Sequence, residues 1–132
     1  MTRRFGIDTS VLVRLLTGDP PAEFDRCADA LRHLIEAEDA VILASNQVIG
    51  EAYIAVQHHY GVSRADARSG LLDVLQSGLV GALNGRPVLA AIEASDSPGL
   101  MDRLITDDYA SNSLEVLTLD RRMASLPSAR LL

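Results

Sequence analysis

Ala40-Val41-Ile42-Leu43-Ala44 is an uninterrupted apolar run in the first half of the chain. Runs of this kind are typical of a strand that is buried on both faces of a parallel sheet. Asp39 precedes the run and Ser45-Asn46 follows it, and either Ser45 or Asn46 suits the cap of a following helix. The segment therefore predicts a strand followed by a helix, the repeating unit of an α/β fold.

Strand-like runs and helical periodicities alternate along the rest of the chain. Further strands are predicted at Phe5–Ile7, Leu79–Leu83, Glu115–Leu119 and Ala129–Leu132. Helices are predicted after the cap Thr9-Ser10, after Asp19-Pro20-Pro21, after Ser45 or Asn46 up to Gly61, from Ser63, from Pro87 to about Ala94, and through Asp102 to Tyr109. Asn84-Gly85 leaves a hairpin turn open as an alternative. The alternation predicts one α/β domain over residues 1–132, with a mainly parallel sheet.

The composition limits the class of protein. The chain has 132 residues, 48% of them hydrophobic but only 4% aromatic, which predicts a single aliphatic core. Cys27 is the only cysteine, so an internal disulfide is excluded, and a small helix residue in a reducing compartment is the expected role. The apolar stretches are strand-sized and the first residues resemble no signal peptide, so we expect a cytoplasmic, soluble protein without a membrane segment.

The charged residues argue against two classes of function. The formal net charge is -6, whereas a protein that coats nucleic acid through charge alone needs a basic surface. All 12 basic residues are Arg, so folds whose chemistry depends on a lysine are disfavoured, and no Walker A loop is present. An enzyme whose acidic pocket is neutralised by a metal ion remains compatible with this charge.

Four acidic residues stand where strands end or helices begin: Asp8, Glu51, Asp102 and Asp120. Ligands of open parallel sheets bind beyond the carboxyl ends of the strands, so the fold can gather these side chains at one edge. Clustered carboxylates repel one another unless a cation lies between them, and Mg²⁺ or Mn²⁺ prefers such oxygen ligands. The pattern predicts a divalent-metal site that hydrolyses a phosphodiester. Each residue alone also fits an ordinary surface or helix-end carboxylate.

Asp8 is the first choice as a direct metal ligand, with the other three carboxylates completing the shell or orienting the attacking water. The hydroxyls of Thr9, Ser10 and Thr118 are expected to hold a ligand, a water or a phosphate by hydrogen bond.

Arginines near these positions are candidates for binding the phosphates of a nucleic acid, because the hydrogen-bond donors of the guanidinium group match phosphate geometry. They are Arg103, Arg121, Arg122 and Arg14, and ordinary solvation is an equal alternative for each. His58 has a weaker claim to a phosphate contact and is interpreted first as a surface or helix-end histidine, and Asp107-Asp108 is interpreted as a solvated face or a helix end.

The order and spacing of these segments closely resemble the PIN-domain ribonucleases, especially the toxins of VapBC toxin–antitoxin pairs. The resemblance rests on four segments and spans nearly the whole chain: Ile7-Asp8-Thr9-Ser10-Val11-Leu12, the helical Glu51, Asp102-Arg103-Leu104-Ile105, and Leu117-Thr118-Leu119-Asp120-Arg121-Arg122. Asn112-Ser113 departs from the pattern, since Gly is usual before the last main strand, but Asn tolerates the left-handed conformation.

The resemblance implies a three-layer sandwich, in which helices flank a central, mainly parallel sheet of four or five strands. It also implies a Mg²⁺ or Mn²⁺ site at the four acidic positions, endonucleolytic cleavage of RNA, a homodimer, and inhibition by a cognate antitoxin whose C-terminal segment crosses the active-site groove. Two alternatives stay open: another phosphoryl-transfer domain with clustered aspartates, and an inactive binding module that keeps the same fold.

Overall fold

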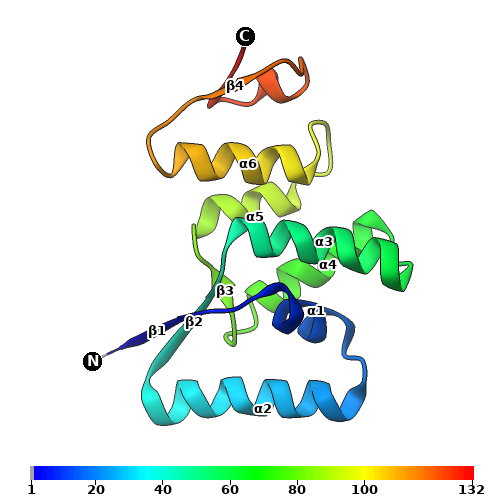
Figure 1. Cartoon of the computed structure of the whole chain (residues 1–132), viewed down its shortest axis with the longest axis vertical. Helices are drawn as coiled ribbons and strands as arrows, with labels where there is room; N and C mark the ends of the chain where they lie inside the picture. The colour runs from blue at the N-terminus through cyan, green and yellow to red at the C-terminus, as the bar shows by residue number, and fades with distance from the viewer. Residues whose placement is uncertain (1) are drawn as a thin grey trace.

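Helices alternate with short strands in the computed structural model, which describes residues 2–132 (Figure 1). The helices are α1 (Thr9–Thr17), α2 (Pro21–Glu38), α3 (Asn46–Tyr60), α4 (Arg64–Leu75), α5 (Arg86–Glu93) and α6 (Leu100–Ala110). The strands are β1 (Arg3–Gly6), β2 (Ala40–Ala44), β3 (Gly81–Ala82), β4 (Val116–Thr118) and β5 (Ala129–Leu131), and a short 3₁₀ helix, η1 (Met123–Ser125), precedes β5. The α/β class is confirmed. Asn84-Gly85 leads into α5 instead of a hairpin, so that alternative is wrong.

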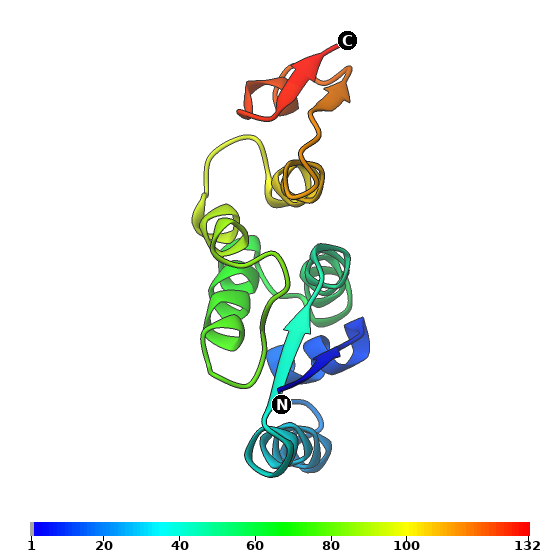
Figure 2. The same cartoon turned by 90° about the vertical axis from the view of Figure 1, so that its left-hand side faces the viewer.

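The strands form two separate parallel sheets, one of three strands in the order β1-β2-β3 and one of two strands, β4 and β5. The expected central sheet of four or five strands is therefore wrong, although the parallel pairing is confirmed. The physical reason is the position of α6, which packs on α3 and α5 and lies between the two sheets (Figures 1 and 2). Strand β4 consequently pairs with β5 and not with β1.

Strand β2 is buried on one face only. Ala40, Ile42 and Ala44 are buried, whereas the side chain of Val41 is 42% exposed. The strand itself is confirmed, but its expected burial on both faces is corrected, because water reaches the Val41 side chain.

The core is aliphatic, as the composition predicts. Leucine, isoleucine and valine from α1, α3, α4, α5 and α6 fill the space between the helices and the three-stranded sheet. The largest fully buried side chains are Leu12, Ile49, Val56, Leu71, Val80, Val88, Ile92 and Leu104. Cys27 lies in α2 and is half-buried, and desolvation raises the pKa of its thiol.

Side-chain caps and glycines define the ends of α3 and α4. The Ser45 hydroxyl accepts the N–H of Val48, which settles the choice between Ser45 and Asn46 as the cap. Gly61 ends α3 with φ 65°, a conformation in which glycine has no Cβ penalty. The Ser63 hydroxyl accepts the N–H of Asp66 at 3.1 Å and so starts α4 as predicted.

Replacement of this cap gives a first prediction. We expect Ser63→Ala to lower the free energy of unfolding by about 1 kcal/mol, because one N–H of the first turn of α4 loses its acceptor. Ser63→Asp, which keeps an acceptor oxygen, is the matched control and should stay near wild type. Urea denaturation followed by circular dichroism measures both variants, and equal losses in the two would contradict the capping role.

Within residues 2–132, none of the helices has both the length and the apolar character that crossing a bilayer demands.

Candidate functional site

Asp8 lies two residues after β1 and is the N-cap of α1. Its Oδ1 accepts hydrogen bonds from the Ser10 hydroxyl at 2.5 Å and from the Val11 N–H at 3.3 Å. The Ser10 bond first, and then the backbone bonds, lower the pKa of Asp8 below its ordinary value. The expected Thr9-Ser10 cap is thus corrected, because both residues belong to the first turn of α1. Asp8 presents an exposed, ionised carboxylate at the carboxyl end of β1.

Glu51 lies in the second turn of α3 and is held by two donors. The Thr9 hydroxyl donates to Oε2 at 2.6 Å, and the Gln47 amide donates to Oε1 at 3.0 Å. These bonds, with Thr9 as the larger cause, lower the pKa of Glu51. Because Thr9 is the neighbour of Asp8, its bond brings Glu51 to the helix start that Asp8 caps. We call these two carboxylates the Asp8–Glu51 pair.

The contact between Thr9 and Glu51 gives a second prediction. We expect Thr9→Val to raise the pKa of Glu51 toward its ordinary value, because the variant loses the donor that favours the charged form. A carbon-detected NMR titration of the Glu51 carboxyl measures this shift. Thr17→Val, in the last turn of the same helix, is the matched control and should leave the titration unchanged. An unaltered pKa in Thr9→Val would contradict the assigned cause.

Asp102 lies in the first turn of α6 and is half-buried. It lines a cavity whose lining includes neither Asp8 nor Glu51. This hollow, of about 260 Å³, is lined by Asp102 together with His58 and Gln57 of α3. His58 and Asp102 thus line the same cavity.

Asp120 follows β4 at the far end of the molecule from α2 (Figures 1 and 2). Its Oδ1 accepts the N–H of Arg122 at 2.8 Å and that of Met123 at 3.4 Å, which closes the turn into η1. The Thr118 hydroxyl accepts the N–H of Asp120 at 3.0 Å. Thr118 thus fixes the backbone of Asp120, and α6 separates both from β1.

Within residues 2–132, no group of three or more His, Cys, Asp or Glu side chains is placed to hold a metal ion. A single copy thus brings Glu51 to Asp8 through Thr9 but does not gather all four predicted carboxylates. The Asp8–Glu51 pair still fits Mg²⁺ or Mn²⁺ chemically, since these ions often bind one or two carboxylates and complete their shell with water and phosphate oxygens. Both carboxylates have lowered pKa values, so they are deprotonated at neutral pH.

The candidate arginines differ in whether their guanidinium groups already interact with other groups of the protein. Arg103 is tied to the loop before α6, donating to the Pro98 carbonyl at 2.8 Å and pairing with Asp96 at 3.2 Å. Arg14 pairs with Glu23 at 2.8 Å. Arg121 and Arg122, beside Asp120, are exposed, as a phosphate contact requires.

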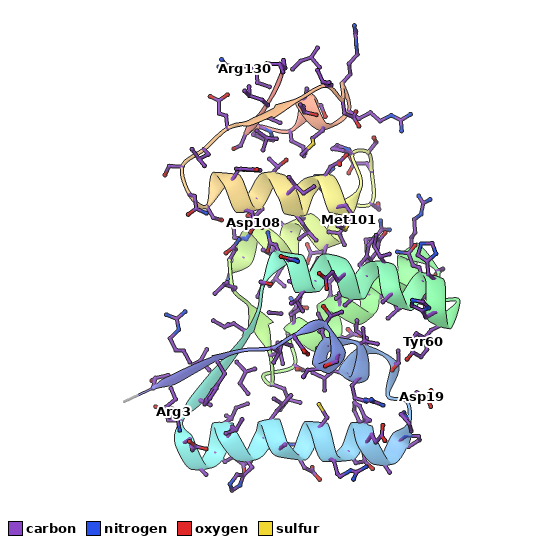
Figure 3. All side chains as sticks on the ribbon, in the orientation of Figure 1. Arg3, Asp19, Tyr60, Met101, Asp108 and Arg130 are labelled. Atoms are coloured by element: carbon purple, nitrogen blue, oxygen red, sulfur yellow. The ribbon has the colours of Figure 1, made fainter. Side chains whose placement is uncertain are left out.

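A groove of about 460 Å³ runs between α3 and α6, and sequence reasoning did not identify it. Its walls are mostly apolar, and Glu51 and Asp108 lie on its lining together with Asn46. Met101 and Asp108 mark the two ends of α6 above α3 (Figure 3). Gly50 leaves room for the Met101 side chain in this contact, since a Cβ at Gly50 would lie 2.8 Å from the Met101 Cε.

Asn46 is the second residue that sequence reasoning missed, having been considered only as a helix cap. It is 3% exposed, and its amide donates to the Leu104 carbonyl at 2.9 Å and to Asp107 at 2.8 Å. These two acceptors fix the orientation of the amide, and its Oδ1 has no hydrogen-bond partner within residues 2–132. Asp107 and Asp108 lie in the last turn of α6, as the helix-end interpretation has it, and Asn84 donates to both carboxylates.

No protein-family model matches the sequence, and the searches of curated proteins and of solved structures gave no match.

Proposed function

We propose that this protein is a metal-dependent endoribonuclease and the toxin of a toxin–antitoxin pair. The observation that supports the proposal most is the Asp8–Glu51 pair, two exposed carboxylates kept ionised by hydroxyl and amide donors at the end of a parallel strand. Oxygen ligands with lowered pKa values at this position suit a hard divalent cation.

A Mg²⁺ or Mn²⁺ ion bound at this position would activate water and polarise the scissile phosphate. In this proposal Asp8 and Glu51 hold the ion, and the Ser10 and Thr9 hydroxyls keep the two carboxylates in place. The proposal keeps Asp102 and Asp120 as residues that complete the metal shell or orient the attacking water, which requires them to come closer to the Asp8–Glu51 pair than they lie in one copy. The exposed Arg121 and Arg122 contact phosphates of the RNA strand.

The groove between α3 and α6 has Glu51 on its lining and suits a partner segment with apolar side chains. In this proposal it receives the C-terminal segment of the antitoxin, which would block the access of RNA to the Asp8–Glu51 pair. The homodimer, the RNA substrate and the antitoxin all belong to the proposal.

A binding module without catalysis is the second candidate function. The observation that favours it is the absence, within residues 2–132 of one copy, of three clustered metal-ligating side chains. Such a module would bind RNA or a partner and cut nothing.

Cleavage of RNA by the purified protein distinguishes the two. We expect a mixed RNA substrate to be cut internally with Mg²⁺ or Mn²⁺ and to stay intact with EDTA. RNA binding without any cutting, whichever divalent ion is supplied, would favour the binding module. Equal cutting in EDTA would remove the metal mechanism.

A further inference from the structure

Arg64 carries a guanidinium group that the fold leaves without an ionic partner. It is the first residue of α4, is exposed, and takes part in none of the ion pairs formed among residues 2–132. Asp66, the nearest acidic residue along the helix, lines a different hollow together with Asp19. A guanidinium group that no carboxylate engages is available to an anionic ligand.

The cavity of about 260 Å³ that Asp102 lines also receives Arg64, so that α3, α4 and α6 all contribute to its walls. His58, in the last turn of α3, stands on the same lining. Its imidazole donates at least one N–H in either charge state, and Arg64 offers five N–H donors in a planar fork. Asp102 is the only acidic side chain among the described residues that line this cavity. Arg64 and His58 therefore direct their donors to a ligand with acceptor oxygens.

This cavity adjoins the groove that has Glu51 on its lining. Ile54 of α3 and Met101 of α6 line both hollows, so the two meet at these side chains. Figure 3 shows Met101, at the start of α6, on the same side of the molecule as Tyr60, at the end of α3. An extended ligand that passes Glu51 can therefore continue along α3 into the cavity.

The spacing along α3 indicates what such a ligand would present. Glu51, Ile54 and His58 follow one another at the i, i+3, i+7 spacing of a single helix face. Glu51 and His58 are separated by roughly 10 Å along the helix axis, at a rise of 1.5 Å per residue. A phosphate beside His58 is thus a different group from one held by a metal ion at Glu51. A nucleic acid strand carries phosphates at such intervals, whereas a mononucleotide does not.

We propose that Arg64 and His58 bind a phosphate of the RNA strand that neighbours the phosphate to be cut. The guanidinium group of Arg64 supplies the charge and the fork of donors, and His58 supplies a further N–H. The carboxylate of Asp102, on the α6 wall, repels the phosphate and so keeps it on the side of Arg64 and His58. The contact fixes the direction in which the strand crosses the Asp8–Glu51 pair.

This inference rests on the proposed function in taking RNA as the ligand, but it does not require that RNA is cut. Binding and cleavage are therefore measured separately.

Binding is measured by fluorescence anisotropy of a short labelled single-stranded RNA, in EDTA and over a series of salt concentrations. We expect Arg64→Gln to weaken binding by about tenfold, the effect of losing a hydrogen bond to a charged group. The slope of log Kd against log salt should fall by about 0.7, the contribution of one phosphate contact with a single strand. Arg64→Lys keeps the charge and should keep this slope. His58→Ala is expected to weaken binding by about threefold.

Arg26→Gln is the matched control. Arg26 is an exposed arginine of α2 and, like Arg64, forms no ion pair within residues 2–132. The variant loses the same charge and should bind RNA as wild type does. Thermal melting confirms that the variants are folded, and His58→Ala decides the matter should Arg64→Gln unfold.

Three results would overturn the phosphate site. They are wild-type affinity and salt dependence in both Arg64→Gln and His58→Ala, an equal loss of affinity in Arg26→Gln, and a wild-type protein that binds no RNA.

Cleavage with Mg²⁺ separates this inference from the proposed function. We expect Arg64→Gln to raise KM and to leave kcat unchanged, because the contact with a neighbouring phosphate is the same before and during the reaction. Weaker binding with a smaller salt slope, in a protein that cuts no RNA, would uphold the phosphate site and remove the nuclease proposal. Cleavage with an unchanged KM in Arg64→Gln would uphold the nuclease and remove the phosphate site.

Discussion

Asp8→Asn and Glu51→Gln are each expected to lower RNA cleavage by more than about 100-fold at saturating Mg²⁺, because loss of a residue that merely orients a metal ligand already costs about 10–100-fold. Both substitutions keep the shape of the side chain and remove the charge that attracts the ion. The measurement is the rate of cleavage of a labelled RNA under single-turnover conditions.

The controls for this result are Asp73→Asn and Glu93→Gln, which neutralise exposed carboxylates on α4 and α5. They change the net charge by the same amount and should cut RNA at the wild-type rate. Loss of activity in the controls as well would indicate a general effect of charge. Full activity of Asp8→Asn would remove the proposed site.

Leu12→Ala is expected to lower the free energy of unfolding by about 3 kcal/mol, within the range for a buried leucine that leaves a cavity. The Leu12 side chain is 0% exposed and lies in the core where α1 meets α3. The same helix contact holds Thr9 against Glu51, so the substitution tests the support of the site. Urea denaturation measures the change.

Leu114→Ala is the matched control, because the side chain is 53% exposed and precedes β4. Its effect should stay within about 0.5 kcal/mol. A decrease in the free energy of unfolding as large as that of Leu12→Ala would mean that Leu114 is buried in solution, which contradicts its exposure in the structure.

The local elements of this fold could be predicted from the sequence because local chemistry decides them. The apolar run Ala40–Ala44 forms β2, and Ser63 caps α4 with the predicted partner Asp66. The first cap was misplaced by one residue, since Asp8, Thr9 and Ser10 are all good caps and only the backbone conformation distinguishes them. The predicted left-handed residue before the last main strand is likewise Ser113, with φ 63°, and not Asn112.

The partner of β4 could not be predicted in the same way. Strand patterns specify that a segment pairs, but tertiary packing chooses its neighbour. Here α6 packs on α3, with Leu104 buried, and β4 lies apart from β1. A resemblance based on the order of motifs carries no information about this separation of β4 from β1.

Part of the candidate site could also be predicted from the sequence. Asp8 at the end of the first strand and Glu51 in the helix after the second strand were predicted to lie at the same end of the sheet, and the Thr9 bond joins them. Asp102 and Asp120 depend on α6 and β4, so their distance from Asp8 in one copy follows from the same packing. Asn46 was not recognised as a buried polar group because its acceptors, Leu104 and Asp107, are distant in sequence.

Binding of Mn²⁺, followed by electron paramagnetic resonance of the free ion, tests the central role of the Asp8–Glu51 pair most directly, since it requires neither RNA nor catalysis. The wild-type protein is expected to take up Mn²⁺ from solution, and Asp8→Asn and Glu51→Gln are expected to leave it free, whereas Asp73→Asn should bind as wild type does. Uptake by both variants equal to that of the wild type, or no uptake by any of the proteins, would contradict a metal site at these two carboxylates.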